Sequence, residues 1–202
     1  DNNVKKIFRY KQYFAVKKCM KRILLEDDEN TRNGVVWHTQ GSGKTITMIM
    51  LTKMILRESM KPDSSIKRPR FVMVTDRINL DKQIRDNFIH TQMSPHRAKT
   101  GKGLIELLKE DGNTVITALV NKFEAAVKQE YCNDSENIFV FIDEGHRTQY
   151  GKLNIYMNRV LPNAVRIAFT GTPLMQKKPK DDKRDVMSAK DTYVKFGPLI
   201  DK

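Results

Sequence analysis

The segment from Trp37 to Thr45 contains the glycines and side chains that are needed to hold a phosphate group. Gly41 and Gly43 allow the backbone to turn with its N–H groups pointing inward, because no Cβ blocks the approach of an anion. Lys44 can reach the β- and γ-phosphates of a nucleotide, and the Thr45 hydroxyl can hold Mg²⁺. The segment therefore predicts a nucleotide-binding loop made by Gln40, Gly41, Ser42, Gly43, Lys44 and Thr45.

The residues on either side of this loop predict the elements that position it. The apolar run 35–37 predicts a buried strand before the loop, and residues 46–56 predict a helix after it. Strand, glycine-rich loop ending in Gly-Lys-Thr, and helix form the phosphate-binding arrangement of P-loop nucleotidases. The start of such a helix also directs unpaired N–H groups at the anion. One position departs from the full pattern, since His38 stands where a glycine is usual. The expected apolar stripe of the helix is Ile46, Ile49, Met50 and Met54.

Two acidic residues, Asp143 and Glu144, directly follow the apolar run 138–142. A carboxylate at the end of a buried strand can hold the Mg²⁺ that bridges nucleotide phosphates, which predicts Asp143 as a metal ligand. The neighbouring Glu144 can orient and deprotonate an attacking water molecule. A solvated acidic turn is the alternative, and the Gly-Lys-Thr sequence upstream favours the catalytic interpretation. Lys44, Asp143 and Glu144 are therefore the predicted catalytic residues.

Apolar runs alternate with segments of helical periodicity along most of the chain. This alternation predicts a doubly wound α/β domain with a mainly parallel sheet and helices on both faces. The expected strands are residues 35–37, 70–75, 115–119, 138–142 and 165–169. Parallel sheets bind ligands beyond the carboxyl ends of their strands. The P-loop, Thr75, Asp143 and Thr170 all lie at the carboxyl ends of expected strands, so they should meet in one crevice.

The composition limits the possible partners and the cellular compartment. A formal net charge of +13 and a pI near 9.7 favour a polyanionic partner, although a solvated lysine-rich surface would give the same charge. Two cysteines, Cys19 and Cys132, predict neither a disulfide framework nor a zinc site. No apolar run reaches membrane-spanning length, and no signal peptide opens the sequence. We therefore expect a cytoplasmic protein without a membrane contact.

Three short sequences occur in the order Gly-Ser-Gly-Lys-Thr, Asp-Glu-Gly-His and Thr-Gly-Thr-Pro, and they resemble motifs I, II and III of superfamily 2 helicases and translocases. Longer sequence segments around these motifs resemble the restriction subunit of type I restriction–modification enzymes. They are residues 37–45, 75–83, 143–151, 161–164 and 169–174. Gly145 departs from that family, which usually has alanine there. The resemblance covers nearly the whole chain, as the first RecA-like motor lobe. It implies an ATP- and Mg²⁺-dependent motor that translocates double-stranded DNA.

The resemblance also implies roles for residues outside the phosphate loop. Gln12 is similar to the glutamine that recognises adenine, with an ordinary glutamine at a helix start as the alternative. The positions similar to those that face the DNA backbone are Thr75, Arg77, Thr117 and Lys122. Strand-end capping is the alternative for the two threonines. The positions similar to those that couple the γ-phosphate to lobe movement are His146, Thr170 and Thr172. A structural histidine is the alternative for His146.

The expected organisation has three parts. Residues 1–30 form an N-terminal helix in which residues 9–12 are similar to the adenine-recognising Q motif, and residues 31–175 form the RecA-like ATP-binding lobe. Residues 176–202 form a mobile connection and a terminal segment that docks, leading to a second RecA-like lobe that would complete the ATP site with an arginine. The resemblance implies modification and specificity subunits as partners, and a nuclease domain outside this sequence. Two other hypotheses remain open: another superfamily 2 helicase acting on DNA or RNA, and a nucleotide- and DNA-binding module without turnover.

Overall fold

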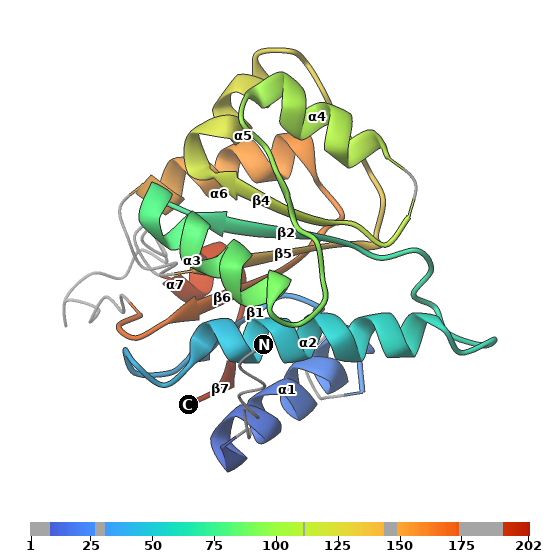
Figure 1. The fold of residues 1–202 in the computed structure, drawn as a ribbon, viewed down its shortest axis with the longest axis vertical. Helices are drawn as coiled ribbons and strands as arrows, with labels where there is room; N and C mark the ends of the chain where they lie inside the picture. Colours follow the sequence, from blue (N-terminus) through green and yellow to red (C-terminus); the bar gives the residue numbers. More distant parts are fainter. Residues whose placement is uncertain (1–8, 27–30, 111, 144–148, 174–191) are drawn as a thin grey trace, which may run out of the picture.

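The computed structural model describes residues 9–26, 31–110, 112–143, 149–173 and 192–202 (Figure 1). Its strands form one seven-stranded sheet in the order β3-β4-β2-β5-β6-β1-β7, and each neighbouring pair is parallel. The strands are β1 (Gly34–Trp37), β2 (Arg70–Thr75), β3 (His96–Arg97), β4 (Val115–Leu119), β5 (Ile138–Asp143), β6 (Val165–Thr170) and β7 (Leu199–Asp201). The helices are α1 (Tyr10–Ile23), α2 (Lys44–Ser59), α3 (Ile78–Ile89), α4 (Gly101–Lys109), α5 (Val120–Val127), α6 (Gln149–Val160) and α7 (Thr192–Phe196). The predicted α/β class with a parallel sheet is confirmed.

Helices cover both faces of the sheet, as a parallel sheet requires (Figure 1). Successive strand residues point to opposite faces, so each strand contributes to two separate cores. In β1, Val36 packs with residues of α1, α2 and α3, whereas Val35 packs with residues of α4, α5 and α6. In β2, Phe71 belongs to the first core and Val72 to the second. This continuous burial explains why the strands are recognisable as apolar runs in the sequence.

The buried face of α2 differs from the expected stripe. Met48, Leu51 and Ile55 are almost completely buried, whereas Met54 is 37% exposed. Helix α2 packs against α1 as well as against the sheet, so its buried surface is broader than one amphipathic stripe (Figure 1). Because half of its 16 residues are apolar and four of these, residues 48–51, are consecutive, helical periodicity could not identify the inward side.

Two short strands, β3 and β7, were not expected from the sequence. Strand β3 consists of only His96 and Arg97, and both are exposed. The sequence there lacks the alternation of apolar and polar residues that would predict a strand. Strand β7 pairs in parallel with β1 and extends the sheet beyond the P-loop strand. Gly34 permits this close packing, since a Cβ at that position would lie 2.5 Å from the side chain of Ile200. The terminal segment, which was expected to dock on the rest of the chain, therefore does so as a strand of the sheet. The expected mobile connection, residues 176–190, lies outside the described residues.

No helix in the described part of the chain combines the length and the apolar character that a membrane crossing would need.

Candidate nucleotide-binding site

The loop between β1 and α2 has the backbone geometry of a phosphate-binding loop. Gly41 and Gly43 adopt left-handed conformations with φ of 78° and 84°, which residues with a Cβ rarely adopt. Gly43 is also the N-cap of α2, so the helix begins inside the loop and points its N-terminus at it. Lys44 is the first residue of that helix and is only 8% exposed. The Ser42 hydroxyl is buried and has no hydrogen-bond partner in the described part of the structure.

Gln12 connects helix α1 to this loop. Its Nε2 donates a hydrogen bond to the Ser42 carbonyl at 2.9 Å, and its Oε1 accepts one from the Arg9 backbone N–H at 3.0 Å. A Cβ at Gly43 would lie 2.3 Å from Gln12 Nε2, so this close approach requires the glycine. The Gln12 side chain therefore holds the loop in place. Its role as the adenine reader stays a prediction.

The segment after β6 is bonded directly to the start of the P-loop. The His38 N–H donates to the Thr170 carbonyl, and Trp37 Nε1 donates to the Gly171 carbonyl, both at 3.0 Å. The Thr172 N–H donates to Thr170 Oγ1 at 3.2 Å, and Thr170 is completely buried. The two expected coupling threonines thus lie at the end of β6 and two residues beyond it, where the chain contacts the phosphate loop. Whether they transmit the γ-phosphate state stays a prediction.

A buried carboxylate contacts the histidine that stands at the glycine position of the loop. His38 Nε2 lies 2.7 Å from Asp201 Oδ2, and Lys18 Nζ lies 2.7 Å from the other oxygen of that carboxylate. The side chains of His38 and Asp201 are 4% and 7% exposed. The contacts join α1, the root of the P-loop and β7. Sequence reasoning noticed the departure at His38 but did not identify Asp201 or Lys18, which lie far away in the chain.

A pocket of about 860 Å³ opens beside the loop and the start of α1. Its lining residues are Arg9, Tyr10, Lys11, Gln12, Trp37, His38, Thr39, Gln40, Gly41, Ser42 and Lys202. The volume falls within the range of small-ligand sites and suits a nucleotide. The Lys202 ammonium lies 4.0 Å from the centre of the Trp37 ring, a cation–π contact on the wall of the pocket.

The remaining predicted residues occupy different positions on the carboxyl edge of the sheet. Asp143 ends β5 beside β6, and Thr45 is the second residue of α2; both are partly buried. The expected contacts Glu144 and His146 lie outside the described residues. No group of three metal-ligating side chains occurs among the described residues. The Thr45 hydroxyl and the Asp143 carboxylate are oxygen donors that suit Mg²⁺, which usually takes its other ligands from phosphates and water.

The four positions expected at the DNA backbone divide into two groups. Thr75 and Thr117 are each only 1% exposed, so their hydroxyls are not accessible to a ligand in this conformation. Arg77 is exposed and Lys122 is partly buried. The DNA contacts stay predictions for all four residues, with the two cations better placed to make them.

The parallel sheet, the left-handed glycine loop and the buried lysine at the start of α2 define a RecA-like P-loop nucleotide-binding lobe. The chain belongs to the SWI2/SNF2 ATPase family, whose pattern matches residues 11–202. The type I restriction enzyme HindI endonuclease subunit of Haemophilus influenzae is 34% identical over 194 residues, covering 85% of this chain. The chain spans only 18% of that relative's length. The resemblance to type I restriction subunits is thereby confirmed.

Two solved structures have the same fold. A nuclease-deletion mutant of the Type ISP restriction-modification enzyme LlaGI, in complex with a DNA substrate mimic, matches 98% of this chain and 20% of its own chain. Its TM-score is 0.63 at 16% identity. The Sulfolobus solfataricus SWI2/SNF2 ATPase core in complex with double-stranded DNA gives a TM-score of 0.61 at 16% identity. That match covers 95% of this chain and 36% of the other.

Proposed function

We propose that this chain is the ATP-binding motor lobe of a type I restriction enzyme R subunit, and that it drives ATP-dependent translocation of double-stranded DNA. The P-loop carries this proposal, because its left-handed glycines and its buried Lys44 suit a nucleotide phosphate. The name of the Haemophilus influenzae relative supports the restriction system, and the DNA complexes of the two structural neighbours support DNA as the partner.

The geometry indicates how the lobe would bind ATP. The N–H groups of the loop and of the first turn of α2 would surround the β- and γ-phosphates, and the Lys44 ammonium would offset their charge. Thr45 and Asp143 would hold Mg²⁺, which supplies further positive charge at the phosphate oxygens. Glu144 would orient the attacking water and accept its proton. These groups recognise the ground state of the nucleotide.

Efficient hydrolysis would need a second lobe. Charge spreads over the transferring phosphoryl group, and an arginine from outside the loop is worth roughly 10³–10⁵-fold in related NTPases. We propose that a second RecA-like lobe supplies this arginine, and that modification and specificity subunits select the DNA target in the cytoplasm. A nuclease domain elsewhere in the full-length protein would then cut the translocated DNA.

The test uses the full-length protein that carries this lobe. Streptavidin bound to one end of a biotinylated duplex should be displaced in the presence of ATP and Mg²⁺, without separation of the DNA strands. Lys44→Ala should abolish the displacement, whereas Lys53→Ala should not, because Lys53 is an exposed cation on the same helix. Strand separation at the same rate would favour an unwinding helicase. ATP binding without displacement or hydrolysis would favour a binding module.

A further inference from the structure

The P-loop is held at both ends by contacts that lead to helix α1. At its C-terminal end, Gln12 donates to the Ser42 carbonyl. At its N-terminal end, the His38 side chain contacts Asp201 of β7, and Asp201 in turn contacts Lys18 of α1. The first connection is direct, whereas the second passes through a carboxylate that lies 163 residues further along the chain. Neither Asp201 nor Lys18 has a role in the sequence motifs.

The Asp201 carboxylate determines how its histidine partner is protonated. Its Oδ1 accepts a hydrogen bond from the Lys18 ammonium at 2.7 Å, and its Oδ2 lies 2.7 Å from His38 Nε2. Because an ionised carboxylate has no proton to give, the imidazole must carry a proton on Nε2 and donate it. The contact therefore fixes both the tautomer and the orientation of the His38 ring.

Burial makes this contact costly to break. The side chains of Asp201 and His38 are buried, whereas that of Lys18 is 56% exposed. The neighbouring Cys19 thiol stays neutral, because burial and then the negative charge of Asp201 raise its pKa. A buried carboxylate that loses a partner keeps its desolvation cost without the compensating interaction. Moving the imidazole away from Asp201 is therefore unfavourable.

The place of His38 sets the start of the P-loop. It directly follows β1, and its own N–H donates to the Thr170 carbonyl, so both its backbone and its side chain are fixed. The middle of the loop has less support, since a Cβ built at Gly41 would meet no atom within 4 Å. The N–H groups of such a loop are preorganised for a phosphate only if its ends are held by supporting contacts. His38 also lines the nucleotide pocket.

We infer that Asp201 is a positioning residue for the P-loop, acting through the Nε2–H of His38, and that nucleotide binding and the docking of β7 stabilise each other. This inference rests on the proposed function, because it concerns the nucleotide site of the motor. In the described part of the chain, Asp201 is not among the residues that line the nucleotide pocket, so it acts on the site through His38. Such coupling is reciprocal, because each event changes the equilibrium of the other by the same factor.

The first test is a double-mutant cycle in the full-length protein, with the affinity for a non-hydrolysable ATP analogue as the readout. Asp201→Asn and His38→Leu should each weaken binding by about three- to fivefold, and the double variant should be no weaker than either single one, because both changes remove the same contact. Losses that multiply in the double variant would overturn the inference. Lys17→Ala is the control, since it removes an exposed cation from α1 and should have no effect.

Two replacements of His38 separate positioning from the filling of space. His38→Gln keeps an N–H donor for the carboxylate, whereas His38→Leu fills a similar space and donates nothing. His38→Gln should therefore keep most of the wild-type affinity for the analogue. Equal losses in the two variants would show that the donor is unimportant and would overturn the positioning role. Thermal unfolding establishes whether each variant folds, and if Asp201→Asn does not, this comparison decides the point.

Hydrogen exchange in the wild-type protein tests the coupling without any substitution. Bound analogue should slow exchange of the β7 amides several-fold, because it favours the state in which β7 is docked. Strand β4 is an internal control, since it lies near the other end of the sheet and should not respond. Unchanged exchange in β7 would overturn the coupling while leaving ATP binding through Lys44 intact. A failed proposed function would instead appear as ATP binding that is lost or independent of Lys44.

Discussion

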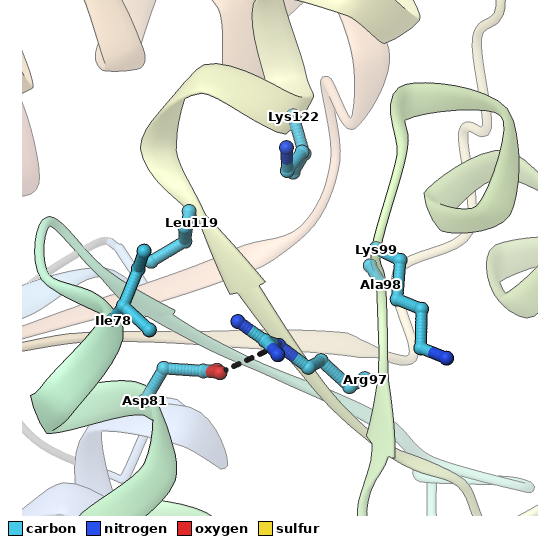
Figure 2. A pocket seen from close by; sticks show the side chains of 7 residues that line it. All are labelled: Ile78, Asp81, Arg97, Ala98, Lys99, Leu119 and Lys122. Atoms are coloured by element: carbon cyan, nitrogen blue, oxygen red, sulfur yellow. Dashed lines mark ion pairs between the residues drawn. The ribbon is translucent and has the colours of Figure 1, made fainter.

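The two basic regions on the carboxyl edge of the sheet hold their cations in different ways. At the P-loop, Lys44 is nearly buried and the loop is fixed by Gln12, Thr170 and the buried pair between His38 and Asp201. A second pocket, at the other end of this edge, is lined by Ile78, Asp81, Arg97, Ala98, Lys99, Leu119 and Lys122, and we call it the Arg97 pocket (Figure 2). Its Asp81 carboxylate is buried, whereas the side chain of Arg97 is 34% exposed. The first arrangement suits one small ligand with a fixed shape. The second suits a long polyanion that must be bound and released at many positions.

The largest expected effect concerns the buried lysine. Lys44→Ala should lower ATP turnover of the full-length protein by at least about 100-fold, because it removes a preorganised charge from the phosphates. Duplex affinity measured without nucleotide should stay within about twofold, since one P-loop lysine is not part of the Arg97 pocket. Steady-state ATPase and fluorescence anisotropy measure the two quantities. Unaltered turnover would remove the basis of the P-loop assignment.

The second expected effect separates the regions by their response to salt. Three phosphate contacts at Arg97, Lys99 and Lys122 would make duplex affinity fall by about 40-fold between 50 and 200 mM salt, from a slope of about 0.9 per contact. Nucleotide affinity should change much less, because Lys44 is largely shielded from solvent ions. Titrations of both ligands over the same salt series test this difference. Parallel salt responses would show that the two regions do not differ in the way described.

A third, smaller effect concerns the bridge from α1 to the loop. Gln12→Ala removes the hydrogen bond to the Ser42 carbonyl and leaves a space beside Gly43. Loss of a buried hydrogen bond is worth about 1–3 kcal/mol, so ATP affinity should fall by about tenfold. Competition between ATP and GTP distinguishes two roles for this residue. An equal loss for both nucleotides supports holding of the loop, whereas a loss confined to ATP supports base recognition.

The smallest expected effect concerns the terminal strand. Asp201→Asn should weaken nucleotide binding by a few-fold, because the neutral amide no longer pairs with Lys18 and His38. Duplex affinity should be unchanged, since β7 lies at the opposite end of the sheet from the Arg97 pocket. Isothermal titration with a non-hydrolysable ATP analogue measures the first quantity. Lys17→Ala is a suitable control, because it removes an exposed cation from the same helix as Lys18.

Much of the fold and of the P-loop could be predicted because their signals are local. Runs such as 138–142 are buried on both faces and are therefore apolar throughout, and the Gly-Ser-Gly-Lys-Thr sequence combines backbone freedom with charge within a few residues. The contacts of Asp201 and of Arg97 could not be predicted in this way. Each depends on a strand of two or three residues whose position is set by pairing with distant strands, and no periodicity marks so short an element.

The pairing of β7 with β1 also determines where this polypeptide can be shortened without harm. Strand β1 carries the P-loop and lies between β6 and β7, and its Val35 N–H donates to the carbonyl of Pro198 at 3.0 Å. A chain that ended at Phe196 would leave β1 as an open edge, with unpaired backbone groups beside fully buried valines. Open apolar edges template pairing between molecules, so such a truncated chain would tend to aggregate through the strand that carries its nucleotide site.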